Sequence, residues 1–383
     1  MIHFSAKSHV HRLVTVLSFV GEYPAHSLYL LGRERVMKEL VHRLTTAQTF
    51  RNDETGEEYT CRLLTITGKG REKSIRFYKA GLVILGWVHP DAYGYYMRSF
   101  WNHRFPGDKA HRERHHRVAE AAVLCMKAGL EVRPYMLPQL QNKGLYQVVP
   151  EKPAFYLAKD IKRVGETEMN KTMFTRMAGA VFSPGGSYAV YNTRASAMKW
   201  SGMGEFKALH SLMEIGRMNA GGLEVDSAVL FGESGEVVLK TLLASEESKR
   251  LEFRFDGIYR HIYFIAMNEL GVRQLKLLML PDWKRNMLEA LFDEESMALN
   301  KGIFEYDAFV DGVYVFSHLD SDLARLIRFK EAVTGGDGRY EVVCYPHQLG
   351  FLKEYLGGRV GYKTIGMELL EAALGKEGWR LLK

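Results

Sequence analysis

The first fifty residues carry the pattern that most restricts the fold, because three consecutive segments place apolar side chains at helical spacing. These segments are residues 9–20, 25–32 and 33–50. Gly21 and Gly32 follow the first two, at the position where a helix commonly ends. The third segment is expected to pack against the core of the domain through one apolar stripe, which consists of Val36, Met37, Leu40, Val41 and Leu44.

A polar turn, RNDETGEE, and an apolar strand, YTCRLLTIT, follow the third helix and predict a hairpin over about residues 51–67. The next stretch, TGKGREKS, is rich in glycine and lysine. It lacks the Gly-x-x-x-x-Gly-Lys-Ser/Thr spacing of a nucleotide-binding loop. Three helices followed by a hairpin is the order of a winged helix-turn-helix. We therefore expect such a domain, of the α+β class, over residues 1–105; the alternative for TGKGREKS is a surface turn that contacts nothing.

The distribution of charge indicates which partner this segment binds. The whole chain has a net charge of +7. Residues 1–133 contain 21 lysines and arginines against 13 aspartates and glutamates, whereas the remaining 250 residues contain 31 against 32. A basic segment joined to a neutral one is typical of a module that binds a polyanion. Double-stranded DNA is the partner we expect, although a merely well-solvated basic domain would show the same balance.

Basic side chains mark the expected DNA contacts. On the third helix, Arg35, Lys38 and His42 recur at helical spacing on a face other than the apolar stripe. Glycines on either side of Lys69 would allow a tight turn that presents charge to phosphates. The predicted DNA-binding residues are Arg33, Arg35, Lys38, His42, Arg43, Arg51, Lys69, Arg71, Lys73 and Arg76.

The rest of the chain predicts a connecting helix over residues 106–132 and a second domain over residues 133–383. In the second domain, apolar strands alternate with helical segments, which favours a mixed α/β layer. We therefore expect an α/β protein overall, with a C-terminal domain of unknown role. The aromatic run AYGYYMRSFW (92–101) is the expected seam of a homodimer, and burial in the core is the alternative.

One alternative function is a metal-dependent nuclease with a PD-(D/E)xK-like core in the C-terminal half. Its site would use Glu205 and Lys207, together with an aspartate. That chemistry needs the two residues on one face of a strand, whereas the surrounding sequence has helical spacing. His111 and His115 lack a third ligand nearby. We expect neither a metal nor a cofactor, and an enzyme is the less favoured interpretation.

The helix–helix–helix–hairpin layout and the following helix, RERHHRVAEAAVLCMKAGLEV, resemble the replication-relaxation type winged-helix proteins of bacterial plasmids and integrative elements. The resemblance covers roughly residues 9–132. It implies a DNA-binding protein that acts in replication, mobilisation or transcriptional control. A further interpretation makes the C-terminal domain a protein-interaction platform that recruits a relaxase or replication protein. Widely spaced cysteines and the lack of a 20-residue apolar stretch predict a cytoplasmic protein that does not enter a membrane.

Overall fold

The computed structural model describes residues 1–100, 103–105, 107–138, 152–161, 176–198, 205–206, 209–210, 212–213, 226–247, 257–297 and 304–374. The chain divides into two compact units. Unit 1 comprises residues 1–127 and 131–138, and unit 2 comprises residues 128–130 and 139–383. Both units combine helices with strands, so the predicted mixed α/β class is confirmed.

The helical start of unit 1 contains α1 (His9–Val20), the 3-10 helix η1 (Ala25–Leu30) and α2 (Glu34–Leu44). The hydroxyl of Ser8 accepts a hydrogen bond from the backbone N–H of His11 and so caps α1. The predicted apolar stripe of α2 is only partly correct. Met37, Val41 and Leu44 are buried, but Val36 is 41% exposed because it lies beside the stripe rather than on it.

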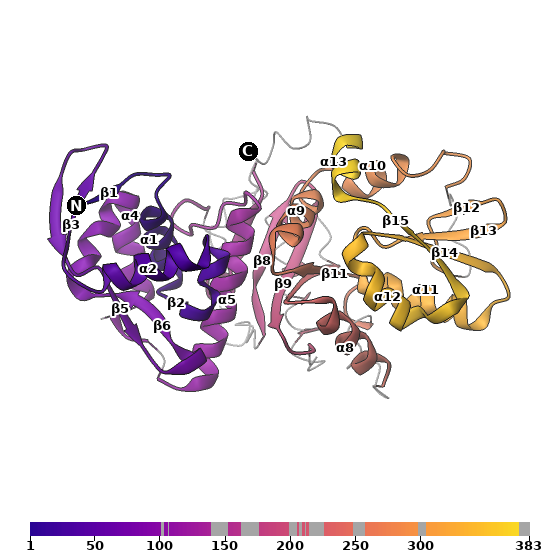
Figure 1. Ribbon diagram of the computed structural model, residues 1–383, viewed down its shortest axis with the longest axis horizontal. Helices are drawn as coiled ribbons and strands as arrows, with labels where there is room; N and C mark the ends of the chain where they lie inside the picture. The colour runs from indigo at the N-terminus through magenta and orange to yellow at the C-terminus, as the bar shows by residue number, and fades with distance from the viewer. Residues whose placement is uncertain are drawn as a thin grey trace. The chain divides into compact units, whose positions relative to one another are not determined.

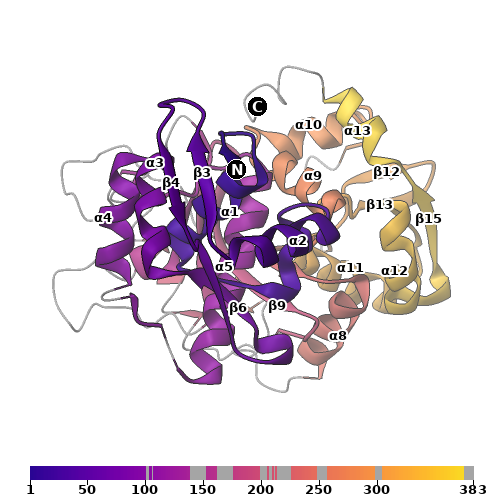
Figure 2. The ribbon, with the colours of Figure 1, turned by 60° about the vertical axis from the view of Figure 1, so that its left-hand side comes forward.

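The described residues of unit 1 also form two small three-stranded sheets. In the first, β1 (Ile2–Phe4) pairs in parallel with β3 (Gln48–Asn52), which pairs with β4 (Glu58–Cys61). In the second, β6 (Ser74–Phe77) lies between β2 (Glu22–Pro24) and β5 (Leu64–Thr67), antiparallel to both. Figure 2 shows β3, β4 and β6 from a second side. The predicted single strand over 59–67 is therefore two strands in different sheets, and the lysine-rich stretch is the turn of a second hairpin.

The remaining elements of unit 1 are two 3-10 helices and three α-helices: η2 (Gly70–Glu72), η3 (Lys79–Ile84), α3 (Leu85–Val88), α4 (Pro90–Ser99) and α5 (Lys109–Lys127). The predicted connecting helix is α5, but it belongs to unit 1, because its alanine-rich face is buried and it packs against β2 and α1. The aromatic run also lies largely in the core. Tyr95, Tyr96 and Phe100 are buried, and Tyr93 is exposed.

A five-stranded sheet forms the first half of unit 2, in the order β11-β10-β9-β8-β7. Its strands are β7 (Ala154–Leu157), β8 (Met177–Ser183), β9 (Gly186–Arg194), β10 (Ser227–Gly232) and β11 (His261–Ala266). The three strands β9, β10 and β11 are parallel, so their amino ends lie along one edge of the sheet. The helices described here are α6 (Ala158–Ile161), α8 (Gly235–Glu246), α9 (Glu269–Leu278) and α10 (Trp283–Glu289).

A four-stranded sheet forms the second half, in the order β12-β13-β14-β15, with β13, β14 and β15 parallel (Figure 1). Its strands are β12 (Ala308–Val310), β13 (Val313–Ser317), β14 (Arg339–Cys344) and β15 (Val360–Thr364). The helices α11 (Leu323–Gly335) and α12 (Leu349–Leu356) connect the parallel strands, and α13 (Met367–Ala373) follows β15. Short 3-10 helices, η8 (Pro346–Gln348) and η9 (Gly357–Arg359), flank α12. The turn before α11 reaches the first sheet, because the N–H of Phe264 donates to the carbonyl of Ser321.

Candidate functional site

The predicted DNA-binding residues of α2 are at the surface of unit 1. Arg35 pairs with Glu39 (Nε–Oε1 3.1 Å) and Lys38 pairs with Glu34 (Nζ–Oε1 2.6 Å), both one helical turn apart. Such exposed pairs are weak, typically below about 1 kcal/mol, and so they exchange readily for other partners. The other predicted residues of this helix region are also exposed: Arg33, His42 and Arg43.

The turn between β5 and β6 brings three more predicted residues together. Lys69, Arg71 and Lys73 are all exposed there. Gly68 has φ = +84°, and a Cβ at this position would lie 2.5 Å from the carbonyl oxygen of Glu72, so the turn requires glycine. Glu72 also pairs with Lys109 and Arg112 of α5. The basic turn is therefore held against α5 while its lysines face solvent.

Two predicted residues lie apart from this set. Arg76 donates to the buried carboxylate of Glu22 (Nη2–Oε2 2.7 Å) and covers the ring of Phe105, with only 16% of its side chain exposed. Its charge compensates a buried carboxylate, so the structure does not present Arg76 for phosphate binding. Arg51 pairs with Glu58 across the β3–β4 hairpin, in the other sheet of unit 1.

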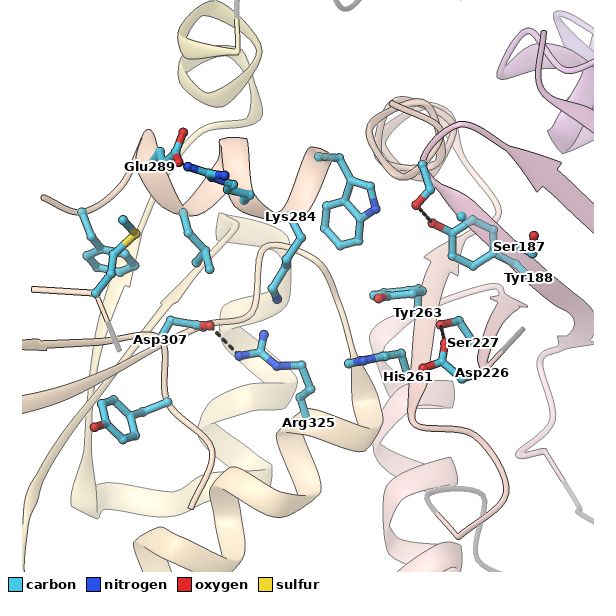
Figure 3. Close-up of a pocket in the computed structure, with 18 of the residues that line it drawn as sticks. Ser187, Tyr188, Asp226, Ser227, His261, Tyr263, Lys284, Glu289, Asp307 and Arg325 are labelled. Atoms are coloured by element: carbon cyan, nitrogen blue, oxygen red, sulfur yellow. Dashed lines mark hydrogen bonds and ion pairs between the residues drawn. The ribbon is translucent and has the colours of Figure 1, made fainter. Parts of the chain in front are cut away.

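Unit 2 contains a cavity of about 910 Å³ that the sequence did not indicate. Its walls are the amino ends of β9, β10 and β11, helix α10 with the residues after it, and the first turn of α11. Figure 3 shows His261 and Tyr263 pointing from β11 toward Lys284 and Arg325. These side chains come from positions up to 64 residues apart, so only the folded chain brings them together.

A buried ion cluster forms one wall of the cavity. The guanidinium of Arg325 pairs with Glu305 (2.7 Å), Asp307 (2.6 Å) and Asp320 (3.0 Å), and its side chain is only 3% exposed. Lys284 also pairs with Asp320. The pKa of Asp320 is lowered because these two cations outweigh the opposing effect of burial. Every charge here has an opposite partner, so removing one member would leave an uncompensated charge in the protein interior.

A second interaction places a histidine at the cavity. Asp322 Oδ2 lies 2.6 Å from His261 Nδ1. The other oxygen of Asp322 accepts from three backbone N–H groups, those of Ile262, Ala324 and Arg325. Asp322 is thus the cap of α11 and is fully buried, while the His261 side chain stays 22% exposed. The aspartate therefore fixes the orientation of the imidazole.

One further histidine of unit 2 is unusual. His318 is fully buried, and neither of its ring nitrogens has a hydrogen-bond partner within the described part of the chain. Burial lowers its pKa to about 4. A neutral imidazole between Phe316 and Phe351 is consistent with that shift, and we assign it a packing role.

Of the two named residues of the alternative nuclease site, the structure describes only Glu205, and it does not lie on a strand. Glu205 is in helical conformation and buried, and Lys207 lies outside the described residues. Burial and the nearby Glu205 carboxylate both raise the pKa of Tyr259. Within the described ranges, no group of three or more acidic, histidine or cysteine side chains is arranged to hold a metal ion.

Comparison of the chain with protein-family models, with curated proteins and with solved structures gave no match. In the part of the chain that the structure describes, no helix combines the length and the apolar character needed to cross a membrane.

Proposed function

We propose that this chain is a double-stranded DNA-binding protein and that unit 1 makes the DNA contacts as a winged helix-turn-helix. The observation that carries the proposal is the sheet order β2-β6-β5 combined with the chain order α1, β2, η1, α2, β5, β6. In winged helices a short strand after the first helix pairs with the second strand of the hairpin, and here β2 pairs with β6. The β3–β4 hairpin is then an insertion between α2 and β5.

In this proposal α2 is the helix that enters the major groove. Arg35 lies near its amino end, which is the end that usually contacts base edges in this motif. An arginine can donate two hydrogen bonds to one guanine. The exposed Val36 beside it could make an apolar contact with the methyl group of a thymine. The turn between β5 and β6 is the wing, where Lys69, Arg71 and Lys73 reach phosphates.

The resemblance to replication-relaxation type proteins suggests the biological setting. Such a protein would act in the replication, mobilisation or transcriptional control of a bacterial mobile element, with a relaxase or replication protein as partner. A homodimer on two half-sites is part of the same proposal. Among the described aromatic residues of the run, exposed Tyr93 is the one available for such a contact, and Trp101 lies outside the described residues. Light scattering should then give a dimer, and a monomer with a single-half-site footprint would contradict it.

The salt dependence of binding tests the proposal directly. Affinity of the full chain for a labelled duplex is measured by fluorescence anisotropy at several salt concentrations. Even about four phosphate contacts should give a slope of about −3 to −4 in log K against log salt. A slope near zero, or no binding at low salt, would overturn the proposal.

Two variants separate base reading from phosphate binding. Arg35→Ala should cost about 1–3 kcal/mol on a preferred duplex and flatten the preference over a scrambled one. Lys69→Ala should weaken both duplexes about equally and reduce the salt slope by about one unit. Lys240→Ala is the control, because it removes an exposed helical lysine of unit 2 that pairs with Glu236. Equal weakening of both duplexes by Arg35→Ala would show that α2 is not the reading helix.

A further inference from the structure

We propose that the cavity of unit 2 is a hydrolytic site in which His261, positioned by Asp322, activates a water molecule against an uncharged carboxylic ester. The proposal is independent of DNA binding by unit 1. It rests on the cavity, on the fixed orientation of the imidazole and on the charges around it. A cavity of about 910 Å³ with converging polar groups is a place where a binding or catalytic site is expected.

The geometry of the His261–Asp322 pair is that of a base with its orienting group. A carboxylate only accepts hydrogen bonds. Nδ1 of His261 therefore carries a proton and donates a hydrogen bond to Asp322 at 2.6 Å. In the neutral form of the ring with its proton on Nδ1, the remaining nitrogen, Nε2, is the proton acceptor. The ring is stacked on Tyr263 at 6.0 Å with an interplanar angle of 8°, and it lines the cavity. Rotation of the imidazole about its Cβ–Cγ bond would break the hydrogen bond to Asp322.

The backbone around the pair is also fixed. Tyr263 and Asp322 form an antiparallel bridge between β11 and the turn before α11. The N–H of Ile262 donates to Oδ1 of Asp322 at 3.1 Å. Because both partners sit on hydrogen-bonded backbone, the distance between base and orienting group does not depend on a mobile loop. Such preorganisation is what proton transfer by a side chain requires.

Water is the nucleophile that the site supports. Ser227 lies beside His261 in the register of β10 and β11 and lines the same cavity. Its hydroxyl donates to Oδ1 of Asp226 at 2.6 Å, so its proton is not directed at the imidazole. His261 is thus assigned to general-base catalysis rather than to activation of the serine.

Two donors face the space in front of His261. Burial and the nearby carboxylate of Asp322 raise the pKa of Tyr263 well above its ordinary value, so its hydroxyl keeps its proton and can donate. Lys284 has three N–H bonds; it pairs with Asp320 and lies over the ring of Trp283, while 30% of its side chain remains exposed. In Figure 3 both side chains point into the same part of the cavity as His261. They are placed to stabilise negative charge on a carbonyl oxygen.

The charges of the lining favour an uncharged substrate. Five carboxylates line the cavity against three basic side chains. Each basic side chain is already paired: Lys284 with Asp320, Arg285 with Glu289, and Arg325 with Asp307. A phosphate or carboxylate group would meet this excess of negative charge without an unpaired cation. Leu288, Phe292 and Met297 add apolar surface for the acyl or alcohol part.

The reaction balances without a redox partner. His261 Nε2 takes a proton from water as the water oxygen bonds to the carbonyl carbon and the carbonyl π electrons move to its oxygen. When the tetrahedral adduct collapses, the bond to the alcohol oxygen breaks, and the leaving oxygen takes the proton from His261. Ester and water become carboxylic acid and alcohol.

The experiment uses the full chain with 4-nitrophenyl acetate and 4-nitrophenyl butyrate, following release of nitrophenolate over many turnovers. His261→Gln and Asp322→Asn should each lower the rate about 10²–10⁴-fold. Asparagine still caps α11 well, but its amide would donate to Nδ1 and so place the ring proton on Nε2. His347→Gln is the matched control, because His347 stacks on Tyr345 outside the cavity lining. It should keep the wild-type rate.

Two results would overturn the proposal. One is a wild-type rate that His261→Gln does not change. The other is loss of rate in His347→Gln to the same extent, because that would trace the activity to surface histidines. If Asp322→Asn does not fold, His261→Gln alone decides, since it replaces a partly exposed ring by a polar side chain.

Discussion

Replacing Arg325 by methionine should destabilise unit 2 by about 3–5 kcal/mol at neutral pH, which is the usual cost of removing one partner from a buried ion pair. The structure identifies the carboxylate that sets this cost. Asp320 keeps Lys284 and Glu305 keeps Arg328 after the change. Among the described residues, Asp307 keeps only the backbone N–H of Ser317, at 2.8 Å, so its charge remains buried without a cation from that part of the chain.

A double variant and a control variant at a neighbouring arginine test whether the uncompensated charge of Asp307 causes the loss of stability. Adding Asp307→Asn removes the uncompensated charge and keeps the acceptor for Ser317, so the double variant should recover about 2 kcal/mol. Arg328→Met is the control, because Arg328 is 34% exposed and shares Glu305 with Arg325. It should cost less than about 1 kcal/mol. Urea unfolding of the full chain, followed by circular dichroism and tryptophan fluorescence, measures all three.

The pH dependence of the free energy of unfolding tests the same reasoning, because it predicts whether the cost of Arg325→Met rises or falls on acidification. Burial acts to raise the pKa of Glu305, but Arg325 and Arg328 outweigh it and hold the pKa below its ordinary value. A lowered carboxyl pKa stabilises the fold above the ordinary value of about 4.3, and that stability is lost as pH falls through the folded-state pKa. Without Arg325 the carboxylates take up protons more readily, so the cost of Arg325→Met should shrink toward acidic pH. Equal costs for Arg325→Met and Arg328→Met at pH 7, or a cost that grows on acidification, would refute the reasoning.

Three further predictions concern unit 1. Ser8→Ala should lower the free energy of unfolding by about 1 kcal/mol, because it removes the cap of α1, and urea denaturation measures this. Gly21→Ala should cost more than Ser8→Ala, since φ is +77° and the new Cβ would lie 2.6 Å from the ring of Phe100; an equal or smaller cost would contradict this. Burial raises the pKa of Cys61 to about 11, so a thiol reagent at pH 8 should modify it only after unfolding, and rapid modification of the native chain would show that this thiol is accessible.

Local patterns in the sequence predicted local structure well. The apolar spacing of residues 9–20 corresponds to α1, and Gly21 ends that helix with positive φ. The sequence predicted less reliably which residues at the border of a helical face are buried, as exposed Val36 shows. A residue at that border can face the core or the solvent, depending on how the helix packs. The hairpin predicted over residues 51–67 is wrong in its pairing, because β3 pairs with β4 and β5 pairs with β6. The sequence does not reveal that β4 and β5 belong to different sheets.

The cavity of unit 2 could not be predicted in the same way. His261 and Asp322 are 61 residues apart, and their contact depends on how two sheets pack. Two local signals did exist. An Asp-Ser-Asp turn before a helical stretch is typical of a helix cap. Two arginines, Arg325 and Arg328, also interrupt the apolar stretch LARLIRF, and a cation that such a stretch buries needs a carboxylate partner.

The turn that positions Asp322 also protects the edge of a sheet. In the five-stranded order, β11 is a terminal strand, and terminal strands expose backbone donors that can recruit another chain. Here the N–H of Ile262 and the N–H of Phe264 are already occupied by Asp322 and Ser321. A substitution that displaces this turn would therefore do more than disturb one histidine. It would open an apolar edge strand, and the expected consequence is aggregation of chains that are otherwise folded.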